Sequence, residues 1–146
     1  MKKYLLIDGH SVIFQWPELR SLHQKNRNKA REVLSGQLAE LHDTSNWLVT
    51  LVFDGKMGSS PVAKHRGMVT AYSTAEQTAD SIIERLVATV VDKERVVVIT
   101  ADVAERNMVE SLGATSYSPD WLRSELKLNE RDWLGTFSEV HRRAKW

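Results

Sequence analysis

The chain has 146 residues, of which 42% are hydrophobic and 27% are charged, and its formal net charge is +1. This balance excludes a protein that attracts nucleic acid through its overall field, so any basic surface must be local. The absence of cysteine excludes disulfides and thiolate metal sites. No run approaches the ~20 apolar residues of a membrane span. We therefore expect one globular domain over residues 1–146 in the cytoplasm.

Strand and helix patterns alternate along the chain. Continuous apolar runs or short β-rich segments predict strands over residues 4–8, 48–54, 68–72, 96–102 and 114–117. Helical patterns occupy residues 17–46, 74–90, 103–112, a segment from 118 and the tail 129–146. Glycine and proline mark the segment 55–61 as a loop, which continues to residue 66. This order predicts an α/β domain, a three-layer sandwich with a central, mainly parallel sheet.

Three of the apolar runs end in an aspartate, namely Asp8, Asp54 and Asp102. Parallel strands bring their carboxyl ends to one edge of the sheet, where open α/β sheets bind their ligands. Two like charges ~4 Å apart at an effective dielectric near 20 cost roughly 4 kcal/mol. A divalent cation offsets that repulsion, so the pattern predicts a metal site.

Two further acids belong to this site if residues 74–90 form a helix that begins at residue 74. Glu76 then lies within the apolar stripe and Asp80 at its margin. The alternative is that these acids favour the helix dipole and that Asp102 caps the helix after it. An all-carboxylate site suits Mg²⁺ or Mn²⁺, and such ions support phosphoester hydrolysis by lowering the pKa of a bound water. We expect Asp8 and Asp102 to be direct ligands, and Asp54 and Asp80 to bind directly or through water.

Four segments together resemble the YacP-like branch of the NYN ribonucleases, which have the PIN-like nuclease fold. They are Asp8-Gly9-His10-Ser11 with Trp16, Val52-Phe53-Asp54, the run from Tyr72 to Asp80, and Ile99-Thr100-Ala101-Asp102. The resemblance covers about residues 3–126. It implies a metal-dependent endoribonuclease that acts on single-stranded RNA and associates with the ribosome. It places catalytic, metal-binding acids at Asp8, Asp54, Asp80 and Asp102, with Glu76 in support.

The sequence departs from the family at His10 and Ser11, where the family usually has tyrosine and asparagine. Ser11 offers only a hydroxyl in place of an amide, yet it can still orient a water or a phosphate. For His10 the favoured interpretation is a partly buried loop residue without a catalytic part. The change affects efficiency and substrate choice more than the chemistry, because the acids are intact.

Basic residues supply two candidate RNA contacts. Lys56, Lys64 and Arg66 follow Asp54 and can hold an RNA backbone if their segment overhangs the acidic edge; a solvated loop is the alternative. A second basic strip precedes and opens the helix of residues 30–41, and we expect it to be solvated; it contains Arg20, Lys25, Arg27, Lys29 and Arg31.

Two other functions compete with the nuclease. One is a catalytically silent RNA- or ribosome-binding module on the same fold. The other is a small phosphohydrolase or phospho-receiver, which is disfavoured because His10 stands where the Asp-x-Asp pattern of many phosphohydrolases needs an acid. The nuclease hypothesis also predicts that clustered acids destabilise the metal-free protein, so Asp54→Asn is expected to raise its melting temperature in chelator.

Overall fold

The computed structural model describes residues 2–55, 62–65, 67–74 and 76–144, with side chains left out for 62–65 and 132–144. It contains a six-stranded sheet in the order β3-β4-β2-β1-β5-β6. All neighbouring pairs are parallel except β3 with β4. The strands are β1 (Lys3–Asp8), β2 (Trp47–Phe53), β3 (Val62–His65), β4 (Met68–Tyr72), β5 (Val96–Ile99) and β6 (Thr115–Tyr117).

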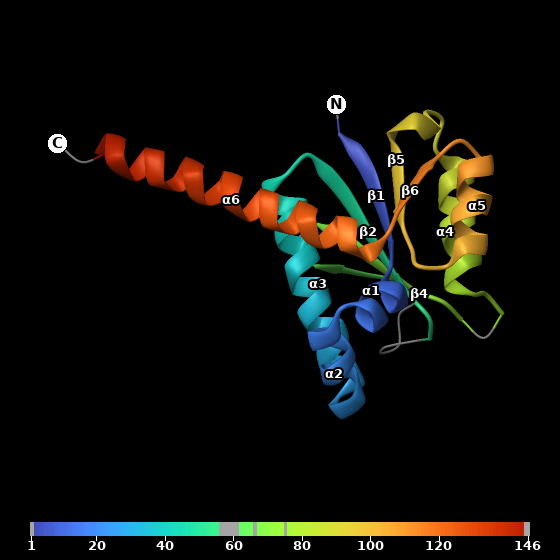
Figure 1. Cartoon of the computed structure of the whole chain (residues 1–146). Helices are drawn as coiled ribbons and strands as arrows, with labels where there is room; N and C mark the ends of the chain where they lie inside the picture. Colours follow the sequence, from blue (N-terminus) through green and yellow to red (C-terminus); the bar gives the residue numbers. More distant parts are fainter. Residues whose placement is uncertain (1, 56–61, 66, 75, 145–146) are drawn as a thin grey trace.

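Helices cover both faces of this sheet (Figure 1). On one face lie α1 (Gly9–Gln15), α2 (Pro17–Lys25), α3 (Arg27–Thr44) and the start of α6 (Pro119–Ala144). On the other lie α4 (Ala79–Thr89) and α5 (Val103–Ser111), with the short 3₁₀ turn η1 (Lys93–Arg95) before β5. The three-layer α/β architecture with a mainly parallel sheet is therefore confirmed.

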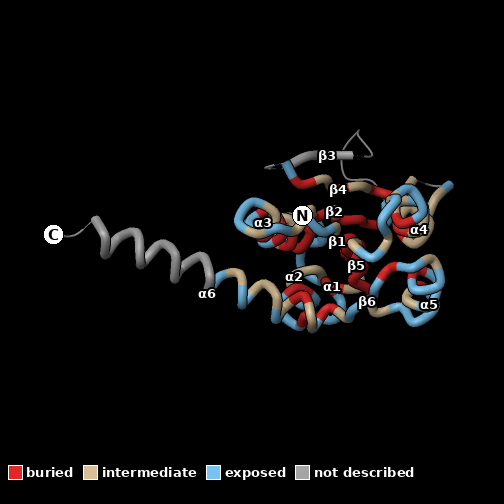
Figure 2. The backbone as a smooth tube through the Cα atoms, turned by 90° about the horizontal axis from the view of Figure 1, so that it is seen from above, coloured by how far each residue is buried: buried red, intermediate tan, exposed pale blue. Residues whose placement is uncertain are grey.

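Alternation along β1 divides the core into two apolar clusters. Leu5 and Ile7 pack with α1, α2, α3 and the first turns of α6, whereas Leu6 packs with α4 and α5. Neighbouring side chains of a strand point to opposite faces, so a run buried on both sides must be apolar throughout. Figure 2 shows the buried strands lying between the two helical layers.

The strand order creates one switch point. The chain leaves β1 toward β2 and β4 on one side, and then returns to β5 and β6 on the other. Connections therefore diverge from the gap between β1 and β5, and a crevice at such a place is where open α/β sheets bind ligands. Asp8 ends β1, and Thr100 directly follows β5.

Several element boundaries differ from those predicted. Helix α1 begins directly after Asp8, where no helix was expected, and the expected 17–46 segment is two helices because Asn26 caps α3 by accepting from the Lys29 N–H at 3.1 Å. Residues 62–65 form β3 instead of a loop. Helix α4 begins at Ala79, five residues later than predicted, because Thr78 and Ser81 form its capping box.

The end of the chain forms one long helix, which also contacts a buried tryptophan. The last predicted helix and the helical tail are one continuous helix, α6. Trp16 is buried in the core, and its indole N–H donates to the carbonyl of Pro119. Within the part of the chain that the structure describes, no helix combines the length and apolar composition needed to cross a bilayer.

Gly9 is required by a close approach of backbone to an aromatic ring. A Cβ at this position would lie 2.2 Å from the buried ring of Phe53. We expect Gly9→Ala to lower the free energy of unfolding by roughly 1–3 kcal/mol, the usual cost of overpacking. Urea unfolding followed by circular dichroism measures this.

Gly36→Ala is the matched control, because the position is inside α3 and its Cβ would meet no atom within 4 Å. This substitution should stabilise the protein by about 0.5–1 kcal/mol through helix propensity. Equal effects of the two substitutions would contradict the assigned role of Gly9.

Candidate metal centre

Three carboxylates meet at the switch point. Asp8, Asp80 and Glu105 each place one oxygen so that all three oxygens lie within 4.8 Å of one another. They come from the end of β1, the first turn of α4 and the first turn of α5. Asp8 and Glu105 are buried and Asp80 is half-buried. The site is thus built by both sides of the crevice and by both helices of one layer.

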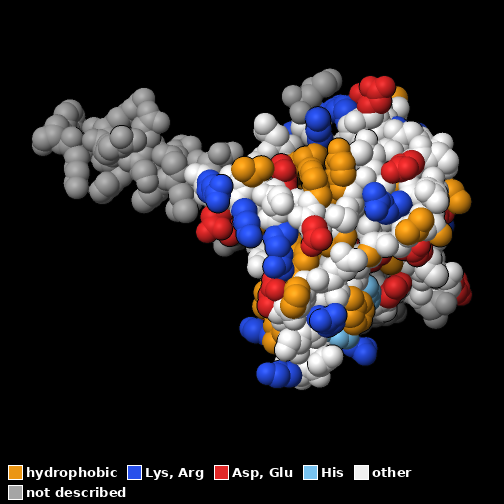
Figure 3. Space-filling model, in the orientation of Figure 1, with side chains coloured by type: hydrophobic (Ala, Val, Ile, Leu, Met, Phe, Trp, Pro, Cys, Tyr) orange, Lys and Arg blue, Asp and Glu red, His pale blue; other side chains and the backbone are white. Residues whose placement is uncertain are grey.

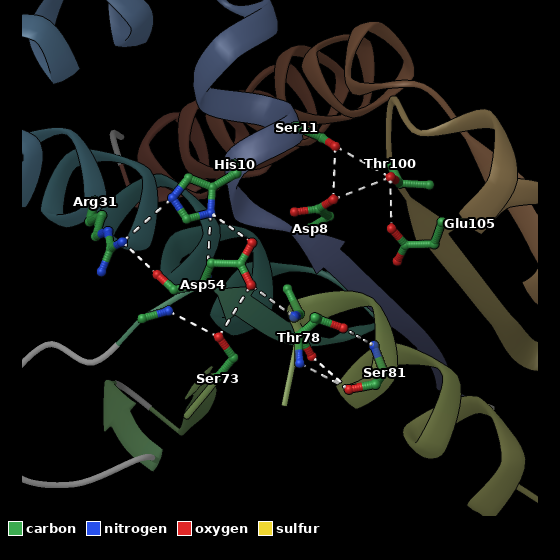
Figure 4. A network of polar contacts seen from close by, with 12 residues as sticks. Asp8, His10, Ser11, Arg31, Asp54, Ser73, Thr78, Ser81, Thr100 and Glu105 are labelled. Atoms are coloured by element: carbon green, nitrogen blue, oxygen red, sulfur yellow. Dashed lines mark hydrogen bonds and ion pairs between the residues drawn. The ribbon is translucent and has the colours of Figure 1, made fainter. Parts of the chain in front are cut away.

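Two hydroxyl groups hold the carboxyl groups of Asp8 and Glu105 in place (Figure 4). Ser11 Oγ donates to Asp8 Oδ2 at 2.9 Å and accepts from the backbone N–H of Ala101 at 3.0 Å. Thr100 Oγ1 lies 3.3 Å from Asp8 Oδ2 and 3.2 Å from Glu105 Oε2. Because Thr100 has one hydroxyl hydrogen, it can donate to only one of these carboxylates at a time. The hydrogen bonds of Thr100 with both carboxyl groups can form at the same time only when one of these groups carries a proton.

The electrostatics identify Glu105 as the group that carries this proton. Its pKa rises to about 9, first because burial removes water from the charged form, and then because Asp80 and Asp8 lie close. The pKa of Asp8 is also raised, mainly by burial, although its hydrogen bonds with Ser11 oppose the shift. A protonated Glu105 can donate to Thr100, and Thr100 can then donate to Asp8.

The residues present fit a hard divalent cation. The three groups offer only oxygen atoms, which Mg²⁺ and Mn²⁺ prefer, and no sulfur or imidazole ligand. Glu105 Oε1 is buried and has no hydrogen-bond partner among the described residues. A buried carboxylate oxygen without a partner is costly, and a cation would satisfy it.

Asp54 lies outside this three-carboxylate cluster. Its Oδ1 accepts from the backbone N–H of Ala79 at 2.9 Å and from Ser73 Oγ at 3.2 Å, so it fixes the start of α4. Its Oδ2 lies 3.8 Å from His10 Nδ1, and more than half of the side chain is exposed. The residue that ends the second apolar run therefore sits on the rim, beside the cluster, where it bridges β2, β4 and α4.

Asp102 and Glu76 also lie outside the cluster. Asp102 caps α5, accepting from the backbone N–H groups of Ala104 and Glu105 through Oδ1, which was the alternative interpretation of its position. Glu76 is exposed and precedes α4, because that helix begins only at Ala79. The predicted apolar stripe containing Glu76 therefore does not exist.

Glu105 is the cluster residue that the sequence analysis missed. It occupies the same face of α5 as Val109, four residues later, and both are buried. A carboxylate on an apolar stripe was the signal used for Asp80, and it also marks Glu105. Its position three residues after Asp102 has a competing explanation, because acids are common in the first turn of a helix.

The proposed substrate-binding residues have different outcomes. Ser11 lies in the cluster's hydrogen-bond network, as described above. Lys56 and Arg66 lie outside the described residues, and Lys64 is described only by its backbone in β3. For one residue of the second basic strip the expectation of solvation was wrong, since Arg31 is only 5% exposed.

His10 belongs to the first turn of α1 and not to a loop. Its Nδ1 accepts from the backbone N–H of Asp54 at 3.3 Å, and its ring is half-buried beside Phe53. Burial is the main cause that lowers the pKa of His10, and the charge of Arg31 lowers it further. These two effects favour the neutral imidazole, whereas the nearby Asp54 carboxylate favours the charged form.

Comparisons with known proteins agree on one family. The family model of the YacP-like NYN domain matches residues 5–145. The uncharacterized protein YacP of Bacillus subtilis (strain 168) is 28% identical over 130 residues, which are 87% of this chain and 76% of that protein.

Solved structures give the same result. The crystal structure of Rae1 (YacP) from Bacillus subtilis matches with a TM-score of 0.80 and 28% identity, covering 97% of this chain and 83% of that one. The crystal structure of a tryptophan-to-leucine mutant of the same protein also matches with a TM-score of 0.80, and the match covers 85% of the mutant's chain. The resemblance stated from sequence motifs is therefore confirmed.

Proposed function

Because the chain belongs to the YacP-like NYN domain family, we propose that it is a metal-dependent endoribonuclease that hydrolyses phosphodiester bonds in RNA. The family implies a nuclease-like function related to RNA. The observation that carries the finer proposal is the meeting of Asp8, Asp80 and Glu105 at the switch point of the sheet. Buried carboxylates gathered there destabilise the fold unless a cation joins them.

In this proposal Asp8, Asp80 and Glu105 hold Mg²⁺ or Mn²⁺ directly. Asp54, on the rim, and Asp102, at the start of α5, contribute through water, and exposed Glu76 adds negative charge at the periphery. When bound, such an ion lowers the pKa of a water and neutralises charge on the phosphate. The catalytic set Asp8, Asp54, Asp80 and Asp102 is thereby kept, with Glu105 added to it.

The chain's own residues prepare the site in two ways. Ser11 and Thr100 fix the Asp8 carboxylate through hydrogen bonds, so its orientation does not have to be organised when substrate arrives. Glu105 must lose its proton before it can bind a cation. Cation binding should therefore release a proton and strengthen as the pH rises toward the pKa of Glu105, about 9.

We further propose that the substrate is single-stranded RNA and that the enzyme acts on it at the ribosome. Cations from Lys56, Lys64 and Arg66 would hold the RNA backbone near the acidic rim. A cytoplasmic location and a single domain over residues 1–146 belong to the same proposal.

Metal-dependent cleavage is the direct test. End-labelled single-stranded RNA should yield internal cleavage products with Mn²⁺ or Mg²⁺, and none in excess chelator. Products that persist in chelator would contradict the proposal. RNA binding without metal-dependent products would instead support the second candidate, a catalytically silent RNA-binding module. This candidate has the same fold, since the YacP-like NYN family model matches nearly the whole chain.

A further inference from the structure

A pocket with an excess of basic side chains lies beside the acidic carboxylate cluster. It is open, with a volume of about 490 Å³. It lies between α1, α2, the start of α3 and the end of β2, and the residues that line it are His10, Phe14, His23, Arg27, Arg31, Asp54 and Gly55. Figure 3 shows histidine side chains next to hydrophobic and basic ones on this part of the surface, over α1 and α2.

Arg31 is the unusual member of this pocket. It is 95% buried, given its exposed fraction of 5%, yet no salt bridge joins it to a carboxylate in the described ranges. Its Nη2 donates to the carbonyl of Asp54 at 2.8 Å, and its guanidinium carbon lies 5.0 Å from the centre of the Phe53 ring. Its Nε has no hydrogen-bond partner among the described residues. Asp54 acts on this guanidinium only at longer range. A buried cation without a directly paired carboxylate is costly, so the site favours an anion.

His10 and Arg31 direct hydrogen-bond donors at the same place. In the tautomer whose Nδ1 accepts from the Asp54 N–H, the ring hydrogen is on Nε2. Nε2 lies 3.5 Å from Arg31 Nη2, so two donors face each other with no acceptor between them. One anionic oxygen placed between them would accept from both.

Helix α3 adds to the positive charge of this place. Arg27 is its first residue, and its first turn contains no acid. A cation at a helix N-terminus is unfavourable for the helix itself, because the N-terminus carries partial positive charge. Its placement is explained if this end of α3 serves an anion.

Phe14 gives the pocket an apolar wall. Its ring is 48% exposed, stacks on His10 with centroids 6.0 Å apart, and meets the edge of His23 at 5.0 Å. Figure 4 shows that His10 and Ser11, although adjacent in the chain, point to opposite sides, toward Arg31 and toward the carboxylates respectively. The pocket and the candidate metal centre therefore share one helix turn.

We propose that this pocket binds one nucleotide of the RNA next to the cleaved bond, with its phosphate on Arg31, His10 and Arg27 and its base stacked on Phe14. This proposal rests on the proposed function, since it assigns a subsite to the same substrate. Stacking on an exposed aromatic ring accepts every base, so the subsite favours unpaired RNA without selecting sequence. Asp54 also lines the pocket and opposes an anion there, but the charges of Arg27 and Arg31 outweigh its single negative charge.

Binding of fluorescein-labelled hexauridylate in chelator, measured by anisotropy, tests the subsite without cleavage. Phe14→Ala should weaken binding about five- to a hundred-fold, as expected for the ~1–3 kcal/mol of one base–aromatic stack. Phe14→Tyr should restore binding, and Phe14→Leu should not. Arg27→Ala should weaken it several-fold and lower the slope of log affinity against log salt by about 0.7. Arg31→Lys should weaken it because lysine lacks the planar fork.

Matched controls lie outside the pocket. Met108→Ala removes a side chain of similar exposure on α5, and Lys127→Ala removes an exposed cation on α6; both should leave the affinity nearly unchanged. The proposal is overturned if the pocket variants bind as the controls do, if Phe14→Leu restores binding as well as Phe14→Tyr, or if hexaglutamate displaces the RNA as effectively as unlabelled hexauridylate does. If the unmodified protein shows no metal-dependent cleavage but the pocket variants weaken RNA binding as predicted, only the nuclease assignment is overturned.

Discussion

Asp8→Asn should abolish RNA cleavage while the fold survives. Asn keeps an oxygen that can accept from Ser11 and Thr100, so the local structure is retained, but it removes the charge that attracts the cation. If the transition state loses several kcal/mol of stabilisation by the cation, the cleavage rate decreases about a thousandfold or more. Initial rates on labelled RNA at saturating Mn²⁺ measure it, with circular dichroism as the check on folding.

Asp102→Asn is the matched control for this experiment. Asn caps a helix about as well as Asp, and a carboxylate that reaches the cation only through water contributes less than a direct ligand, so the loss of cleavage should be smaller than in Asp8→Asn. If Asp102→Asn were as inactive as Asp8→Asn, the direct-ligand role expected from the sequence would hold instead. Full cleavage by the Asp8 variant would defeat the metal-centre proposal.

Glu105→Gln should stabilise the metal-free protein, and the gain should grow with pH. The pKa of Glu105 is about 9 in the folded protein and 4.5 as the reference value, so folding takes up a proton between these values. Its contribution to stability is fully present below pH ~4.5 and is lost as the pH rises toward 9. The gain in melting temperature in chelator should be small at pH 5 and at least about 3 °C at pH 8.5.

Metal addition provides the second half of this test. Mg²⁺ or Mn²⁺ should raise the melting temperature of the unmodified chain more than that of Glu105→Gln, since the variant has lost a ligand. A gain in chelator that is equal at pH 5 and pH 8.5 would count against a raised pKa, as would a loss. The stabilising substitution expected from the sequence, Asp54→Asn, is replaced by this one, because Asp54 is bonded to α4 and stands outside the cluster.

Apolar runs predicted the sheet well, because burial on both faces leaves little freedom in composition. The strands β1, β2 and β5 each begin and end within a few residues of the expected ranges. Local capping decided where the helices start, and there the sequence was ambiguous. Thr74 and Thr78 are both plausible caps, and only the second is used, with Ser81 completing the box.

The candidate site was predicted in part. Asp8 and Asp80 were identified because a strand end and an apolar helix stripe are strong local signals. Asp54 and Asp102 carry the same strand-end signal, but each is engaged by backbone N–H groups at the start of the helix beside it. A strand-end aspartate can serve a cation or a helix start, and its neighbours in space decide between them.

By itself the sequence determined the layered α/β fold, the edge of the sheet where acids gather and the family, because periodicity and short motifs are local properties. Only the tertiary structure decided which oxygens meet. It brought Glu105 on α5 against Asp8 and Asp80, and it buried Arg31 on the other side of α1 without a carboxylate partner among the described residues. Which charges share a pocket depends on helix start, rotation and crossing over the sheet, and these are set by contacts between residues far apart in the chain.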